Sequence, residues 1–97
     1  MSFKSPINDG QQLMAITAEE CGELIQVCMK LMRKNATLEE MMQDRKFREK
    51  LVEEVGDVAC MIGLLAEHGL VSYEELETRA NIKLKKLRQW STIADVD

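Results

Sequence analysis

The sequence predicts an all-α protein, a helical bundle of three long helices and one short helix that is completed by oligomerisation. Apolar residues recur at spacings of three and four along three long segments, which is the period of an amphipathic helix. Two capping-box patterns stand before helical stretches. The one proline is Pro6, so no later residue forces a helix to break. The 97 residues are expected to form a single domain.

The first long helix is predicted to follow an irregular lead of residues 1–8. Asn8 or Asp9 is the expected N-cap, and the helix is expected to run to about Lys34. Its apolar positions are Leu13, Ile16, Leu24, Val27, Cys28, Leu31 and Met32.

A short helix is predicted over Leu38–Gln43. Asn35-Ala36 breaks the first helix, and Thr37 with Glu40 three residues later forms a capping box. This helix is expected to serve as a corner or a lid between longer ones.

The third helix is predicted from about Arg45 to His68, with Gly69 as its left-handed cap. Its apolar residues repeat at four, three, four and three: Leu51, Val55, Val58, Ile62 and Leu65.

The last helix is predicted from a second capping box, Ser72 with Glu75, to about Trp90. Residues 91–97 are expected to form a frayed tail. One stripe of this helix carries Tyr73, Leu76, Ala80, Leu84 and Leu87.

The composition limits the partners of the chain. A formal net charge of -4 argues against a general nucleic-acid binder, which needs a basic face. No apolar stretch approaches 18 residues, so no membrane partner is expected. Cys21, Cys28 and Cys60 form no CxxC pair, which favours reduced, buried thiols in a cytoplasmic protein. A chain this short has a modest core, so association is expected.

The chemistry is indicated by a short internal repeat. Residues 19–23 read EECGE and residues 53–57 read EEVGD, with an offset of 34 residues. Side chains three apart on a helix project to one face, about 5–6 Å from each other. Glu20 therefore pairs with Glu23, and Glu54 with Asp57. If the two long helices pack antiparallel, four carboxylates meet.

Four carboxylates in one place repel one another unless a cation neutralises them or some are protonated. Oxygen ligands of this kind suit Mg²⁺ or Mn²⁺. Gly22 and Gly56, each one residue before the last acid of its block, suggest that a neighbouring helix or a ligand approaches the backbone closely. A single ExxE is usually a solvated helix face, but its repetition beside apolar residues favours a metal site over that interpretation.

The paired motif resembles the MazG-type all-α nucleotide pyrophosphohydrolases, a superfamily that includes dimeric dUTPases, dCTP pyrophosphatases and HisE-type phosphoribosyl-ATP pyrophosphohydrolases. The resemblance covers residues 12–90 and is carried by Glu19-Glu20-x-x-Glu23 and Glu54-x-x-Asp57. The small single-domain members of bacteria and their phages are closest in layout. The location that this implies is the cytoplasm, or the host cytoplasm for a phage protein.

The resemblance implies Mg²⁺-dependent cleavage of a nucleoside triphosphate to the monophosphate and pyrophosphate, with Mn²⁺ as a substitute metal. The implied metal ligands are Glu20, Glu23, Glu54 and Asp57. Glu19 or Glu20 is the implied general base, while Glu19 and Glu53 are outer-sphere or substrate-side acids. The implied phosphate-binding residues of the last helix are Asn81, Lys83, Lys86 and Arg88.

Two features depart from the family pattern. Thirty residues separate Glu23 from Glu54, a long interval that the short helix accounts for. The basic residues of the last helix do not fix a unique alignment, and a plain solvated basic face is the alternative. The alternatives for function are a phosphoribosyl-ATP pyrophosphohydrolase of the same fold and a non-enzymatic helical module that dimerises or binds a partner helix. A homodimer or homotetramer is expected in each case.

Overall fold

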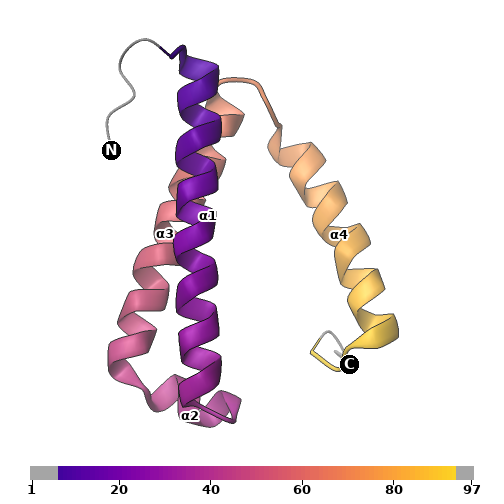
Figure 1. Cartoon of the computed structure of the whole chain (residues 1–97). Coiled ribbons are helices and arrows are strands. Elements are labelled where there is room, and N and C mark those ends of the chain that lie inside the picture. The colour runs from indigo at the N-terminus through magenta and orange to yellow at the C-terminus, as the bar shows by residue number, and fades with distance from the viewer. Residues whose placement is uncertain (1–6, 94–97) are drawn as a thin grey trace. The chain divides into compact units, whose positions relative to one another are not determined.

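The computed structural model describes residues 7–93, and every regular element in that range is a helix (Figure 1). The helices are α1 (Asp9–Lys34), α2 (Leu38–Gln43), α3 (Arg45–Glu67) and α4 (Tyr73–Trp90). The chain divides into two compact units, residues 1–64 and residues 65–97. Each unit is described by itself. The predicted all-α class is confirmed over the described range, and the expected lead and tail lie partly outside it.

Local capping fixes where the first two helices begin. Asn8 is the N-cap of α1: its Oδ1 accepts from the backbone N–H of Gln11 at 2.8 Å, and Gln11 Oε1 accepts from the N–H of Asn8 at 3.1 Å. Thr37 caps α2 in the same way, with Oγ1 accepting from the N–H of Glu40 at 3.1 Å. Each box satisfies backbone donors that the first turn of a helix leaves without partners. The capping predicted from the sequence is confirmed at both sites.

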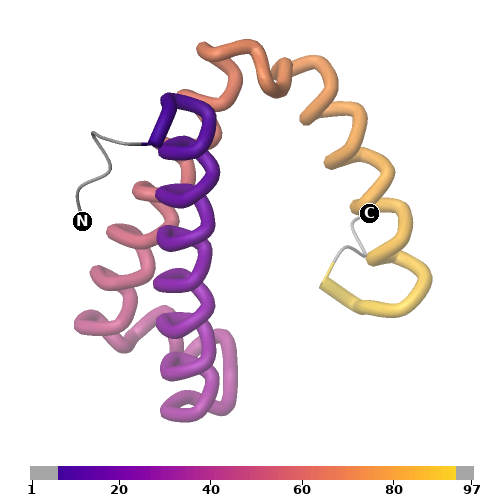
Figure 2. Tube along the Cα trace, turned by 45° about the horizontal axis from the view of Figure 1, so that its top comes forward, coloured from indigo at the N-terminus to yellow at the C-terminus, as the bar shows by residue number. Residues whose placement is uncertain are grey.

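In the first unit, α1 and α3 lie side by side and antiparallel, joined through α2 (Figures 1 and 2). The buried hydrophobic residues of the described chain are Leu13, Val27 and Leu31 of α1 and Met61 of α3. None of the large side chains in the described range is fully shielded from solvent. Two helices in contact bury one narrow stripe each, so this core is small.

The corner between α1 and α3 is held by a polar network. The Asn35 side-chain amide donates to the Leu31 carbonyl at 3.3 Å and to Asp44 Oδ2 at 2.9 Å. Lys34 Nζ lies 3.3 Å from the same carboxylate oxygen, and Asp44 Oδ1 accepts from the backbone N–H of Phe47 at 3.4 Å. These bonds lower the pKa of Asp44, and the hydrogen bond donated by Asn35 makes the largest contribution. The corner therefore sets how α3 turns back along α1.

In the second unit, Ser72 caps α4 by accepting from the backbone N–H of Glu75 at 3.1 Å, as predicted. Gly69 has φ of +80°, the left-handed conformation expected of the residue that ends α3. Leu76 and Leu87 are half-buried, and α4 has no buried residue. The apolar stripe predicted for this helix is therefore only partly covered.

The predicted burial of the cysteines is wrong for two of the three. Cys28 and Cys60 are exposed, Cys21 is half-buried, and all three are free thiols. Cys28 follows the buried Val27, so its side chain points about 100° around the helix from the contact line with α3. The contact between α1 and α3 therefore covers fewer positions than their apolar stripes contain, and Cys28 and Cys60 lie outside it.

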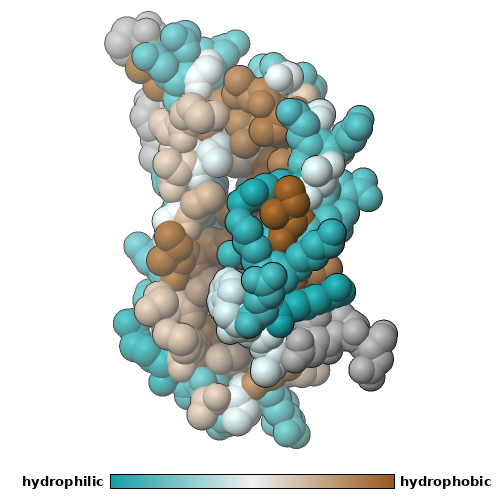
Figure 3. Space-filling view, turned by 90° about the vertical axis from the view of Figure 1, so that its right-hand side faces the viewer, coloured by the Kyte–Doolittle hydropathy of each residue, from teal (hydrophilic) through white to brown (hydrophobic). Residues whose placement is uncertain are grey.

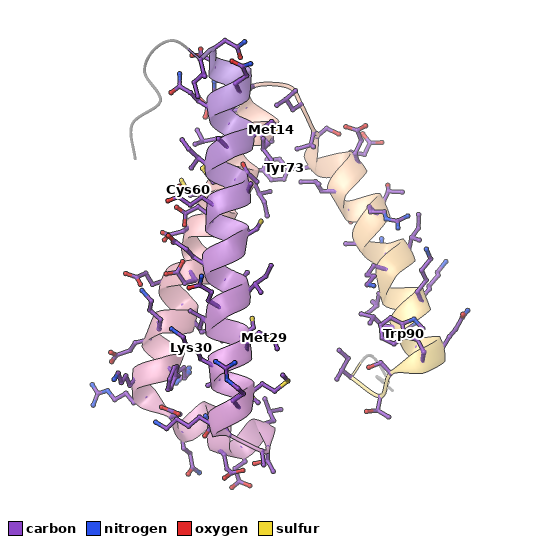
Figure 4. The ribbon with its side chains drawn as sticks, in the orientation of Figure 1. Met14, Met29, Lys30, Cys60, Tyr73 and Trp90 are labelled. Atoms are coloured by element: carbon purple, nitrogen blue, oxygen red, sulfur yellow. The ribbon has the colours of Figure 1, made fainter. Side chains whose placement is uncertain are left out.

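Hydrophobic side chains lie at the surface of both long helices of the first unit. Figure 3 shows hydrophobic residues exposed among hydrophilic ones, and Met14 and Met29 in Figure 4 extend from α1 on the side away from α3. The exposed apolar residues of α1 and α3 are Met14, Ile25, Met29, Met32, Val52, Val55 and Ile62. Within the described residues, no helix is both long and apolar enough to cross a bilayer.

Asn35→Ala is expected to destabilise the protein by about 1–3 kcal/mol, because it removes two hydrogen bonds from a nearly buried site and leaves Asp44 Oδ2 with Lys34 as its remaining partner. Urea unfolding measures this change. Gln43→Ala, at an exposed amide of the neighbouring α2, is the matched control and is expected to stay within about 0.5 kcal/mol of the native protein. Equal effects of the two substitutions would contradict a structural role for the Asn35 network.

Candidate metal centre

Four carboxylates converge between α1 and α3. Glu20 and Glu23 of α1 and Glu54 and Asp57 of α3 each offer one oxygen, and these oxygens all lie within 4.8 Å of one another. The ExxE and ExxD spacings bring each pair to one helix face, and the antiparallel contact brings the two faces together. The convergence that the sequence predicted is therefore present in the first unit. Metal binding at this acid cluster stays a prediction.

The acid cluster lies at the edge of the core. Glu54 is 4% exposed, Glu20 and Glu23 are half-buried, and Asp57 is exposed. One buried oxygen in each of Glu20 and Glu54 has no hydrogen-bond partner among the described residues, and the same holds for Glu19. Buried polar atoms are almost always paired, and an unpaired buried carboxylate oxygen is costly. A cation, or a proton on one of the carboxylates, would give these oxygens a partner.

The pKa of Glu20 also reflects burial and the crowding of like charges in the acid cluster. Burial of its carboxyl raises the pKa above the ordinary value of 4.5, and the negative charges of Glu23, Asp57, Glu54 and Glu19 raise the pKa further. A group with a raised folded-state pKa contributes stability below its unfolded pKa, and that stability is lost as the pH rises through the folded value. Ionisation of Glu20 therefore costs stability in the folded protein, and a bound cation would reduce that cost.

An internal cation already offsets part of this charge. Lys50 Nζ lies 3.2 Å from Glu54 Oε1 and 2.6 Å from Glu53 Oε2. The hydrogen bonds to Glu53 and Glu54 raise the pKa of Lys50, and the bond from Lys50 lowers the pKa of Glu53. Glu53, which the family resemblance made an outer-sphere or substrate-side acid, is thus exposed and paired with a lysine. Lys50 was not among the predicted site residues, although its position three and four residues before the two glutamates is the signal of such a pair.

The donor set fits a hard divalent cation. All the converging atoms are carboxylate oxygens, the ligand type that Mg²⁺ prefers. Ligands on opposite sides of Mg²⁺, at about 2.1 Å each, stand about 4.2 Å apart. The oxygens of the cluster, all within 4.8 Å, are therefore close to the required spacing.

The two helical glycines do not have the close neighbour expected of them. A Cβ placed on Gly22 or Gly56 would meet no atom within 4 Å among the described residues, outside the helix's own backbone. The expectation that a neighbouring helix of this chain approaches them closely is therefore wrong. The reason is that both residues sit beside the contact line of α1 and α3 and not on it. The other alternative, a ligand at this backbone, stays a prediction.

The basic residues predicted to bind phosphate all lie on α4, in the second unit. Asn81, Lys83, Lys86 and Arg88 are exposed. Lys83 Nζ stands 5.2 Å from the centre of the Trp90 ring, a cation–π contact that gives this lysine a structural role within α4. Their relation to the acid cluster stays a prediction.

Comparison of the chain with protein-family models, with curated proteins and with solved structures gave no match. Membership of a family therefore stays a prediction from the sequence motifs.

Mg²⁺ or Mn²⁺ is expected to raise the melting temperature of the native protein, because an ion that binds only the folded state stabilises it by mass action. At about 100 times the dissociation constant the gain is about 2.7 kcal/mol, or about 10 °C or more for a chain of this size. Glu20→Gln is expected to abolish the shift and to raise the melting temperature without metal, since one repelling charge is gone.

The matched control for the metal response is Glu39→Gln, at an exposed acid of α2 outside the cluster. It should keep the full shift. A native protein whose melting temperature does not respond to either ion, in differential scanning calorimetry, would show that the acid cluster binds no metal.

Proposed function

We propose that this protein is a Mg²⁺-dependent nucleotide pyrophosphohydrolase that cleaves a nucleoside triphosphate, or a related nucleotide, to the monophosphate and pyrophosphate. The observation that carries the proposal is the meeting of two EExxE-like blocks, 34 residues apart in sequence, in one acid cluster between α1 and α3. The same blocks carry the resemblance to the MazG-type pyrophosphohydrolases. A metal site made of four carboxylates is the element that this chemistry requires.

The residues of the acid cluster have distinct roles in this proposal. Glu20, Glu23, Glu54 and Asp57 hold the metal through carboxylate oxygens. Bound Mg²⁺ neutralises phosphate charge and stabilises the negative charge that develops on the leaving pyrophosphate. Without it the acids would repel the substrate. Mn²⁺ has the same preference for oxygen and is the expected substitute.

Hydrolysis needs a group that takes a proton from the attacking water. Glu19 is suited to this, because its buried Oε2 has no hydrogen-bond partner among the described residues. Glu20 is the alternative, because its carboxylate lies in the acid cluster where the metal and the attacking water would meet. The glutamate takes a proton from water, and the water oxygen bonds to the α-phosphorus. The bond from the α-phosphorus to the oxygen that bridges the α- and β-phosphates breaks, and pyrophosphate leaves with the electron pair of that bond.

The test is pyrophosphate release from a panel of nucleoside triphosphates and phosphoribosyl-ATP in the presence of Mg²⁺. Turnover of at least one nucleotide is expected. Glu20→Gln and Asp57→Asn are each expected to lower kcat by about 100-fold or more, because each removes a charge that holds the metal. Their circular dichroism should match the native protein.

Glu77→Gln, at an exposed acid of α4, is the control and should retain native kcat. If the folded protein with Mg²⁺ cleaves no member of the panel, the enzymatic proposal fails. Turnover of phosphoribosyl-ATP alone would select the alternative substrate on the same fold.

A second candidate function, a non-enzymatic helical module that binds a partner helix, is favoured by one observation. Hydrophobic side chains such as Met29, Met32 and Val52 lie exposed on the first unit. This module requires no metal, so it predicts that Glu→Gln substitutions in the acid cluster leave its binding unchanged. The metal response of the melting temperature separates the two functions.

We also propose that the chain forms a homodimer or homotetramer. The support is the small core: the buried hydrophobic residues of the described chain are four, and none of them belongs to α4. Sedimentation velocity at micromolar concentration should give a mass of at least twice 11.1 kDa. Met29→Lys, which puts a charge on the exposed apolar face, should reduce association. A monomeric native profile would contradict this proposal.

A further inference from the structure

A groove between α1 and α3 lies beside the acid cluster, wholly within the first unit. It encloses about 540 Å³, a volume typical of small-molecule sites. Glu23 and Glu54 of the acid cluster line it together with three lysines, Lys30 of α1 and Lys46 and Lys50 of α3. Figure 4 shows Lys30 on the side of α1 that faces α3. We call this site the lysine groove.

Two of its lysines lack an internal counter-charge. Lys50 is held by Glu53 and Glu54. Lys30 and Lys46 form no ion pair with any carboxylate of the described residues. They stand on opposite walls of the groove, one on each helix. Two ammonium groups facing one space attract an anion that reaches both of them.

The charges are ordered along the groove. Lys46, Lys50 and Glu54 follow one another at four-residue intervals, so they lie on one face of α3 at successive turns. Glu23 and Lys30 stand seven residues apart, on one face of α1. On both helices the cation is therefore separated from the acid cluster by about 10–12 Å of helix axis. A short chain of phosphates attached to a metal at the cluster covers such a span.

We propose that the lysine groove binds the phosphate chain of the substrate, with Lys30 and Lys46 donating hydrogen bonds to its non-bridging oxygens. The chemical class of this ligand, a linear polyphosphate, rests on the proposed pyrophosphohydrolase function. The proposal places phosphate recognition on α1 and α3. It does not require the basic residues of α4, such as Lys83 and Lys86, that the family resemblance suggested.

Other anions fit the lysine groove less well. A nucleic acid is an extended polyanion, and both the net charge of -4 and the two carboxylates in the groove repel it. A single carboxylate ligand is too short to cover the distance of about 10–12 Å along the helices from the acid cluster to Lys30 and Lys46. A polyphosphate that carries a divalent cation at one end complements the acids at that end and the ammonium groups at the other.

The experiment is isothermal titration calorimetry of the full chain with imidodiphosphate, an analogue of pyrophosphate that resists hydrolysis, in buffer with MgCl₂. The double substitution Lys30→Gln, Lys46→Gln is expected to weaken binding by about tenfold or more, since it removes two charge-assisted hydrogen bonds. Arg48→Gln removes one positive charge from the same helix, outside the groove, and should change the affinity by less than about twofold. The melting temperature of each variant confirms folding.

The result that overturns the proposal is native affinity in the double variant, or no binding of imidodiphosphate by the native chain. A loss of affinity only in Lys83→Gln, Lys86→Gln would likewise overturn it and assign the phosphates to α4. The proposed function and the lysine groove can fail independently. If the chain binds imidodiphosphate through Lys30 and Lys46 but cleaves no nucleotide, the groove is an anion site and the enzymatic proposal is wrong. If the double variant cleaves nucleotides with native KM, the enzymatic proposal holds and the lysine groove is not the phosphate site.

Discussion

The antiparallel packing of α1 against α3 is the constraint on which the first unit depends, because it places carboxylates of both helices in one cluster. Packing the two helices antiparallel brings Glu20, Glu23, Glu54 and Asp57 together, with Glu54 nearly buried and one of its oxygens unpaired. Such an arrangement raises the free energy of the folded chain, because buried like charges lose hydration and gain no partner. A sequence that only needed a stable pair of helices would place apolar or oppositely charged residues there. A bound cation would reverse this unfavourable electrostatics, and this is the physical support for the proposed metal site.

Lys50 shows how the chain tolerates this repulsion. Its ammonium group contacts Glu54 and Glu53, so one end of the acid cluster is partly neutralised from within. The same lysine lines the groove that contains Lys30 and Lys46. Two acids of the cluster and three lysines thus line the same groove between α1 and α3. This shared lining links the proposed metal site to the proposed phosphate site and gives both a common origin in the packing of two helices.

The packing of α1 against α3 leaves much of their apolar surface exposed. The contact between α1 and α3 buries Leu13, Val27, Leu31 and Met61, while several methionines and branched residues of the same helices face solvent. A contact between two helices buries only a narrow stripe on each, whereas the apolar stripes of these helices are wider. Further packing partners are needed to cover the remainder, which is the physical basis for the proposed association. The corner at Asn35 and Asp44 is independent of such partners, since its bonds are local.

Helix positions and the members of the acid cluster followed from the sequence alone. Capping boxes at Thr37 and Ser72 are local hydrogen-bond patterns, and a spacing of three on a helix fixes which acids share a face, so both depend only on nearby residues. Tertiary structure decided how deeply each acid is buried, that Lys50 pairs with Glu54, that Lys30 and Lys46 face one groove, and that Cys28, Gly22 and Gly56 lie off the contact line. These features depend on the rotation of α1 against α3, a long-range quantity that the spacing of residues within a single helix does not contain.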